Sequence, residues 1–229
     1  MSRSGGIVYH LRSLLHGKKG SNALWADHRA GVEKFLMLWN PPEKKLILIG
    51  PSGGYSLPKN FLDRFDEIIA FEPDPLARLI FEKRFQLKPR WITEAVQFHQ
   101  LDTFSKLIPV GSAVLFSNLL GQLYFKRSSE VQKNLAKILA PFSWASYHDA
   151  LSGENLEFDT ELAETGRKAT LSQMKSWIYP KIKGGTLEVN AHQAPDLFAP
   201  QSEVKFYYWQ WRIHPKRTHL IEGVFHVKT

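Results

Sequence analysis

The stretch Leu-Ile-Leu-Ile-Gly-Pro-Ser-Gly-Gly-Tyr, residues 46–55, decides the fold class. Its first four residues form an unbroken apolar run, which is typical of a strand buried on both faces of a parallel sheet. The glycines that follow permit a sharp turn and let a ligand approach the backbone closely. We therefore predict a strand over residues 45–49 and a ligand-binding turn at its carboxyl end.

An acidic residue follows the next apolar run. Residues 67–71 predict a second strand, and Glu-Pro-Asp-Pro comes directly after it, at residues 72–75. Glu72 lies 22 residues after Gly50. This is close to the spacing at which a carboxylate accepts hydrogen bonds from a ribose diol. The turn and the acid together are more specific than a glycine-rich turn alone.

Strands and helices alternate through residue 147. Further strands are predicted at residues 95–99, 112–117 and 142–147, and helices at residues 58–65, 75–85 and 129–139. Such alternation predicts an α/β fold whose parallel sheet is covered on both faces. Two runs rich in β-branched and aromatic residues, 204–213 and 219–227, predict a closing antiparallel pair. Tyr207, Trp209 and Trp211 alternate along the first run and are predicted to fill the core.

We expect a single domain over residues 1–229. Helical spacing of apolar residues before Asn40-Pro41-Pro42 predicts an N-terminal helical cap over residues 1–42, because proline ends a helix at the preceding residue. Residues 150–202 contain paired glycines and scattered prolines, which predicts a loop-rich insertion before the final hairpin.

From about residue 30 onward, the chain resembles class I S-adenosylmethionine-dependent methyltransferases. The turn at residues 50–54 matches the family's glycine-rich motif, residues 71–75 match the acidic end of its second strand, and the closing hairpin matches its sixth and seventh strands. The resemblance implies a mostly parallel, seven-stranded doubly wound sheet with an antiparallel C-terminal strand, a methyltransferase-like Rossmann fold. It also implies methyl transfer from S-adenosylmethionine to a small-molecule or macromolecular acceptor.

The same resemblance implies a set of site residues. Those expected to hold the cofactor are Gly50, Ser52, Gly54, Glu72, Pro73, Asp102 and Asn118. In this set, Asp102 lies where the family contacts the adenine, and Ser52 stands where the family usually has a second glycine. Asn118 after the fourth strand and His148 at the end of the fifth are the candidate catalytic residues. No metal site is expected.

Two other functions remain open. Residues 50–54 also spell Gly-x-Ser-x-Gly, the nucleophile elbow of α/β-hydrolases, with Ser52 as nucleophile. The partners for such a triad would come from Asp149, Asp196, His214, His219 and His226. Against this hypothesis, too few residues precede the turn for the strands that usually come first, and no His-Gly oxyanion segment lies upstream. Alternatively, the fold is a non-catalytic module that acts on RNA or protein.

Composition limits the function further. The 229 residues carry a net charge of +8, with an excess of +5 in residues 1–50 and +3 in residues 201–229, but at most two basic residues are adjacent. Nucleic-acid binding is therefore possible but not favoured. The absence of Cys excludes disulfides, thiolate metal sites and a thiol nucleophile. The short apolar runs and the lack of a secretory signal predict a cytoplasmic protein with no membrane partner.

Overall fold

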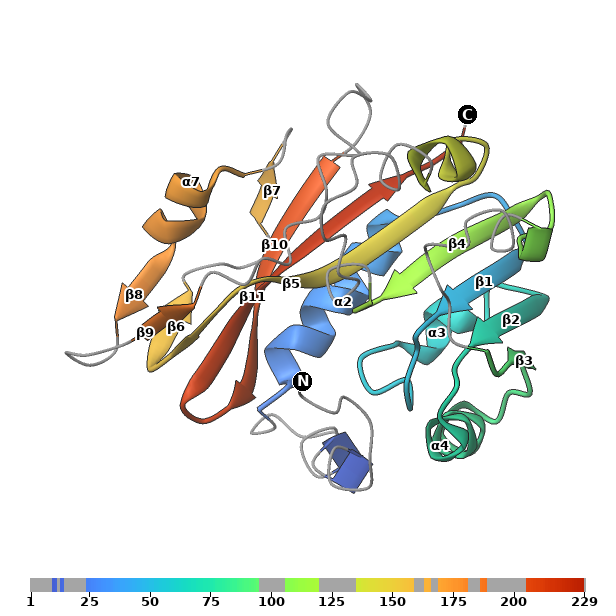
Figure 1. The fold of residues 1–229 in the computed structure, drawn as a ribbon, viewed down its shortest axis with the longest axis horizontal. Helices are drawn as coiled ribbons and strands as arrows, with labels where there is room; N and C mark the ends of the chain where they lie inside the picture. The colour runs from blue at the N-terminus through green and yellow to red at the C-terminus, as the bar shows by residue number, and fades with distance from the viewer. Residues whose placement is uncertain are drawn as a thin grey trace.

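The computed structural model describes residues 10–11, 13–14, 24–94, 106–119, 135–158, 163–165, 169–180, 186–188 and 205–228. These residues form an α/β structure in which one large twisted sheet is covered by helices (Figure 1). The predicted third-strand acid, Asp102, lies outside the described residues. The same holds for residues 95–99, where the third strand was predicted.

The sheet has the strand order β3-β2-β1-β4-β5-β11-β10-β7. Its strands are β1 (Lys45–Ile49), β2 (Glu67–Phe71), β3 (Arg90–Ile92), β4 (Ser112–Ser117), β5 (Trp144–Glu154), β7 (Ala163–Thr165), β10 (Lys205–His214) and β11 (Arg217–His226). The first five pair in parallel, and β11 lies antiparallel between β5 and β10. This confirms the expected methyltransferase-like Rossmann fold with its antiparallel C-terminal strand.

The predicted count of seven strands is wrong. Within the described part of the chain, β7 adds an eighth strand along the edge of β10, and β9 (Thr186–Glu188) pairs with the end of β5. Both additions come from the stretch that was predicted to be loop-rich. They form because β10 would otherwise present an open edge and because β5 runs on to Glu154, seven residues beyond its predicted end.

The same stretch contains a smaller sheet and a helix. Strands β6 (Leu156–Phe158) and β8 (Ile178–Pro180) pair antiparallel. Helix α7 (Leu171–Ser176) begins at Thr170, whose side chain accepts a hydrogen bond from the backbone N–H of Gln173 in a capping box. The described residues between 154 and 188 therefore contain short regular elements joined to the main sheet through β5 and β10.

Each face of the sheet has its own core. In β1, Leu46 and Leu48 pack on one face and Ile47 and Ile49 on the other, as period-two alternation requires. The helices on the first face are α2 (Ala26–Leu38), α3 (Lys59–Leu62) and α4 (Pro75–Phe85). Leu135, Leu139 and Met174 cover the second face. The two apolar layers explain why the central strands read as continuous hydrophobic runs.

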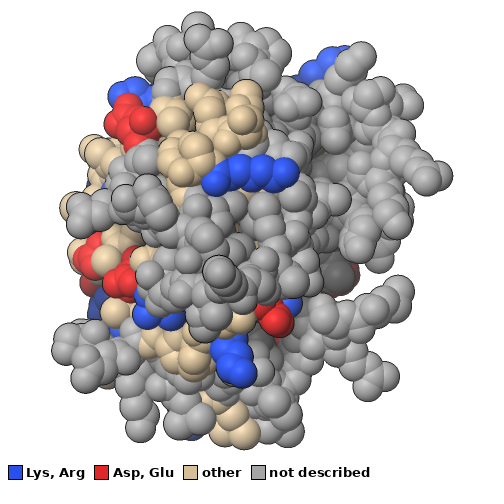
Figure 2. Space-filling model, turned by 90° about the vertical axis from the view of Figure 1, so that its left-hand side faces the viewer, with Lys and Arg blue, Asp and Glu red and all other residues tan. Residues whose placement is uncertain are grey.

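The aromatic side chains of β10 belong to the core. Tyr207, Trp209 and Trp211 are buried against α2, which confirms their prediction as core residues and leaves no exposed stacking platform for bases there. On the face drawn in Figure 2, the described Lys and Arg side chains lie scattered among acidic ones. Near the two basic ends of the chain, Lys45 pairs with Glu67 and Lys205 with Glu164.

The helices that the structure describes include none with the length and apolar character needed to span a bilayer.

Gly31 allows α2 to pack closely on the sheet. A Cβ atom at this position would lie only 2.4 Å from Cδ1 of Trp209. The indole of Trp209 is buried and packs against Phe35 and Tyr147, so it has no room to move away. The close contact between α2 and β10 therefore requires glycine.

We expect Gly31→Ala to lower the free energy of unfolding by about 1–3 kcal/mol, because the added methyl overpacks the interface. Without this clash, the same change inside a helix would raise stability by about 1 kcal/mol. Chemical denaturation measures the difference. Adding Trp209→Leu should make Gly31→Ala less harmful than it is in the native background, and a stabilised single variant would contradict this packing.

Candidate functional site

The turn after β1 is built on left-handed backbone. Gly50 and Gly54 both have φ of 67°, and Ser52 between them has φ of 50°. The N–H of Gly50 donates to the carbonyl of Phe71 in β2, and the N–H of Gly54 donates to the carbonyl of Pro51. The turn is thereby closed on itself and tied to the carboxyl end of the neighbouring strand.

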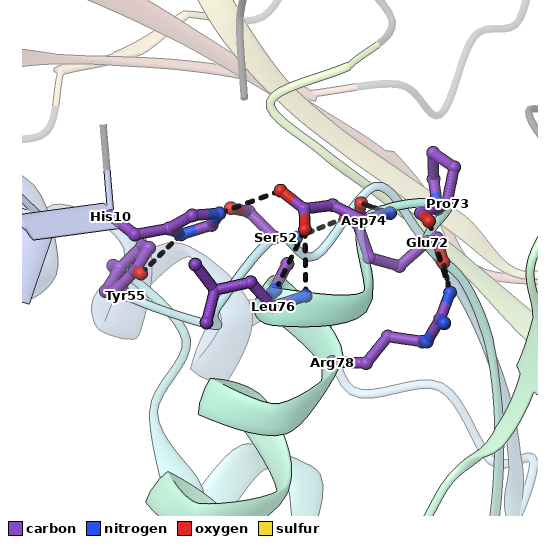
Figure 3. Close-up of polar contacts among 9 residues, drawn as sticks. His10, Ser52, Tyr55, Glu72, Pro73, Asp74, Leu76 and Arg78 are labelled. Atoms are coloured by element: carbon purple, nitrogen blue, oxygen red, sulfur yellow. Dashed lines mark hydrogen bonds and ion pairs between the residues drawn. The ribbon is translucent and has the colours of Figure 1, made fainter. Parts of the chain in front are cut away.

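Glu72 joins the two loops at this edge of the sheet (Figure 3). Its Oε2 accepts the N–H of Ser52 at 2.9 Å, and its Oε1 accepts the N–H of Asp74 at 3.0 Å. The residue is only 8% exposed. Burial raises the pKa of the Glu72 carboxyl and the charge of Asp74 adds to this, while the two backbone hydrogen bonds oppose the rise. Among the residues that the structure describes, the hydrogen bonds that position this carboxylate come from backbone N–H groups.

The loop after β2 is held by its own residues. Asp74 caps α4 by accepting the N–H groups of Leu76 and Ala77. Arg78 reaches back from the first turn of α4 and donates to the carbonyls of Glu72 and Pro73. The Glu-Pro-Asp-Pro segment therefore ends β2, starts α4 and fixes Glu72 in one short run.

His10 connects the N-terminal segment to both loops. Its Nδ1 lies 2.7 Å from the hydroxyl of Tyr55, and its Nε2 lies 2.9 Å from Oδ2 of Asp74 (Figure 3). The imidazole is buried, so the N-terminal helical segment packs against the glycine-rich turn and the acidic loop together. His10 was not among the predicted residues, and no local motif marks it.

Two of the glycines are explained by packing within the chain. A Cβ at Gly53 would lie 2.6 Å from the ring of Tyr55, and one at Gly54 would lie 2.3 Å from the ring of Phe85 in α4. Gly50 faces Leu119, which follows β4, with its would-be Cβ at 3.1 Å. The turn is therefore in contact with α4 on one side and with the loop after β4 on the other.

The structure brings most of the predicted cofactor residues to one edge and separates the predicted base from them. Asn118, with φ of 53°, follows β4 and donates its N–H to the carbonyl of Tyr147 at 3.0 Å. His148 is 0% exposed, and its Nε2 lies 3.3 Å from Oε1 of the equally buried Glu222. Glu222 also accepts the hydroxyl of Tyr208, whose pKa is raised by burial and by that carboxylate. His148 is thus enclosed within the core.

The described residues do not form the catalytic triad that the hydrolase hypothesis requires. Asp149 and His219 do meet, with Oδ2 and Nδ1 3.1 Å apart. However, among the described residues Ser52 contacts neither of them: its N–H is bound to Glu72, and its hydroxyl makes no hydrogen bond. The Asp–His pair exists without the serine that a triad requires.

A second polar cluster lies beneath α2. His28 stacks on Trp211 at 4.4 Å between ring centroids, and its Nδ1 lies 3.2 Å from Nε1 of Trp209. Burial lowers the pKa of His28 from its ordinary 6.5 to about 3, opposed by Asp149 and assisted by His219. An indole N–H can only donate, so Nδ1 of the neutral ring accepts and Nε2 carries its proton. Among the described residues, no group of three acidic, His or Cys side chains is arranged to hold a metal.

Comparison with solved structures finds methyltransferases among the similar chains. One match is magnesium protoporphyrin IX methyltransferase from Synechocystis PCC 6803, solved with bound SAM, at 10% identity over 94% of this chain and 90% of that one, with a TM-score of 0.48. Another is the N-methyltransferase NodS from Bradyrhizobium japonicum WM9, at 7% identity over 91% and 99%, TM-score 0.46. An rRNA methylase from Streptococcus thermophilus matches at 11% over 86% and 95%, TM-score 0.41.

No protein-family model matches the sequence, and the search of curated proteins finds no match. The strand order and strand directions described above, rather than these distant superpositions, identify the fold.

Ser52→Gly should stabilise the protein by about 0.5–1 kcal/mol, because glycine adopts a positive φ without the strain that a Cβ introduces. Ser56 lies four residues further along the same loop and does not have a positive φ. Ser56→Gly should therefore reduce stability or leave it unchanged. Thermal and chemical denaturation of both variants test the difference in sign. A destabilised Ser52→Gly would mean that the hydroxyl has a role that its contacts do not reveal.

Because His28 is buried and neutral, the free energy of unfolding should decrease as the pH falls. The unfolded chain binds a proton near pH 6.5 and the folded chain only near pH 3, so stability is complete above pH 6.5 and falls as the pH drops below it. The expected loss is about 1 kcal/mol per pH unit. His28→Gln should flatten this slope between pH 6.5 and 5, whereas His214→Gln, at an exposed position, should not. Equal slopes in all three proteins would contradict the assignment.

Proposed function

We propose that this protein is an S-adenosylmethionine-dependent methyltransferase whose cofactor lies over the turn at residues 50–54, with its ribose on Glu72. The observation that carries the proposal is the hydrogen bond from Ser52 N–H to Glu72 Oε2, which places the acid of β2 directly beside the turn of β1. Ligands of open α/β sheets bind at such carboxyl-end crevices. The methyltransferase-like strand order agrees with this use of the site.

The free hydrogen-bonding capacity of the site fits this cofactor. A carboxylate has about four lone-pair positions, and Glu72 uses one on each oxygen for Ser52 and Asp74. The remaining positions can accept the two hydroxyls of a ribose. Among the residues that the structure describes, the N–H of Gly53 has no partner and can donate to a carboxylate or another polar part of the ligand.

When bound, the cofactor supplies a methyl group already activated on a sulfonium sulfur. The chain is then required to hold the donor and acceptor in line and to exclude water. In this proposal Glu72 fixes the ribose, Pro73 shapes the adjoining loop, and Gly50, Ser52 and Gly54 form the surface beneath the cofactor. Asp102 at the adenine and Asn118 near the transferred methyl stay predictions.

We also propose that residues 1–42 act as a cap on this site within a single domain over residues 1–229. The support is the contact of buried His10 with Tyr55 of the turn and Asp74 of the acidic loop. A cofactor placed between these loops would lie beside the N-terminal segment. The methyl acceptor in this proposal is a small molecule or a macromolecule.

Calorimetric titration with S-adenosylmethionine and S-adenosylhomocysteine tests the cofactor assignment. Glu72→Gln should weaken binding by about 1.5–3 kcal/mol, because the amide loses charge-assisted hydrogen bonds. Glu67→Gln is the matched control, since Glu67 is the acid at the opposite end of the same strand and is exposed. Failure of the native protein to bind either compound at millimolar concentration would refute the proposal, as would equal binding by the two variants.

A further inference from the structure

Strand β5 carries polar side chains beyond the point where β4 ends. Tyr147 pairs with Ser117, the last residue of β4, and Asp149 lies two residues further on. The pairing with β11 then shifts by one residue, so that Ile221 faces Asp149 and Leu220 faces Leu151. This bulge leaves Ala150 unpaired, and Ala150 and Leu151 both pack in the second core. Bulges of this kind re-aim side chains, often next to active sites.

Asp149 meets His219 of β11 on the face of the sheet that α2 covers. Oδ2 of Asp149 lies 3.1 Å from Nδ1 of His219, and His219 is 8% exposed. Burial alone would raise the pKa of the Asp149 carboxyl, but the close contact with His219 and the nearby imidazoles hold it below its ordinary value. Because an ionised carboxylate only accepts hydrogen bonds, an imidazole serving as a base here would hold its proton on Nδ1 and present the lone pair of Nε2.

Three polar atoms around this pair lack partners. Nε2 of His219, Oδ1 of Asp149 and Nε1 of Trp211 are buried and make no hydrogen bond to any residue that the structure describes. The Trp211 ring lies 5.8 Å from the His219 ring, so the atoms belong to one cluster. Buried polar atoms in native proteins almost always have a partner. Several orphaned atoms together indicate a site for a polar ligand.

The cluster is linked to the cofactor turn through packed rings. Trp211 lies 5.1 Å from Trp25, and Trp25 lies 6.4 Å from Tyr55, the residue that follows the turn. His28 stacks on the other side of Trp211 and remains neutral. The Asp–His pair therefore lies on the same face of the sheet as Tyr55, and a series of ring contacts through Trp211 and Trp25 connects the two.

We propose that His219, oriented by Asp149, is the base that takes the proton from the methyl acceptor, which is therefore a hydroxyl compound or an amine. This inference rests on the proposed methyltransferase function. As the acceptor oxygen or nitrogen forms its bond to the methyl carbon, the carbon–sulfur bond breaks and its electron pair stays on the sulfur, giving a neutral thioether. The acceptor's proton passes to Nε2 of His219, and the resulting imidazolium is stabilised by Asp149. Every proton and electron pair is accounted for within the acceptor, the cofactor and this pair.

The assignment differs from the predicted base, His148. That imidazole is completely buried against Glu222. His148 comes one residue before Asp149 in β5, and Glu222 comes three residues after His219 in β11, so both lie on the face opposite the Asp149–His219 pair. His219 also has a carboxylate beside one ring nitrogen and no described partner on the other, but it is 8% exposed whereas His148 is 0% exposed. A general base needs such a carboxylate and access to the acceptor.

Labelling with diethyl pyrocarbonate tests the site without knowledge of the acceptor, because this reagent acylates an unprotonated imidazole nitrogen. Peptide mapping should show that His219 reacts well before His148, and that S-adenosylhomocysteine slows the reaction at His219 at least threefold. Asp149→Asn should slow labelling of His219, and Asp149→Glu should restore part of the rate. Circular dichroism checks that each variant is folded. An unreactive His219 in the folded protein, or labelling that is indifferent to both the cofactor product and Asp149, would overturn the proposal.

A transfer assay supplies a second measurement. With catechol and a primary amine as probe acceptors and methyl-labelled S-adenosylmethionine as donor, His219→Gln should reduce any product formation at least hundredfold, the usual scale of general-base catalysis. Its dissociation constant for S-adenosylmethionine should stay within twofold of the native value. His214→Gln is the control for loss of an imidazole. Because cofactor binding is measured separately, failure of the base assignment is distinguishable from failure of the methyltransferase proposal.

Discussion

The pairing of β1 with β2 on one side and β4 on the other is the constraint on which the site depends. All three strands are parallel and in register, so Ile49, Phe71 and Phe116 lie side by side at one edge of the sheet. Whatever follows these residues in the sequence is brought to the same place. The glycine-rich turn, the Glu-Pro-Asp-Pro loop and Asn118 meet for this reason, although the first and last are more than 60 residues apart in the sequence.

In the proposed function, Glu72 combines a structural role with a binding role. Its carboxylate is buried at an energetic cost, and two backbone N–H groups from different loops offset part of that cost. The same bonds hold the oxygens in a fixed position, which reduces the entropic cost of binding a ligand there. The left-handed conformation of Ser52 is part of this arrangement, because it turns the N–H of that residue toward Glu72.

The sequence predicts the parallel half of this protein well. Continuous apolar runs predict the exact bounds of β1, β2 and β4. Short runs of this kind are typical of strands that are buried on both faces of a sheet. The sequence predicts less of residues 150–202, where short strands such as β7 form only because distant β10 offers an edge. Likewise β3, at Arg90–Ile92, has three residues and a half-exposed pattern that carries little periodic signal. The Asp149–His219 contact depends on a one-residue bulge between strands about 70 positions apart, which no local pattern encodes.

The position of β11 has a consequence for how the sheet is completed. This strand follows every other described strand in the sequence, yet it lies inside the sheet, between β5 and β10. During synthesis, β5 therefore keeps one long unpaired edge until residues 217–226 have left the ribosome. The aromatic β10 cannot take its final place earlier, because β11 is its link to β5. Such long-range strand pairs form slowly, and the unpaired apolar strand edges stay exposed until the pairs have formed. A chain interrupted before β11 would present β5 and β10 as two open strands, a state that chaperones and proteases would recognise.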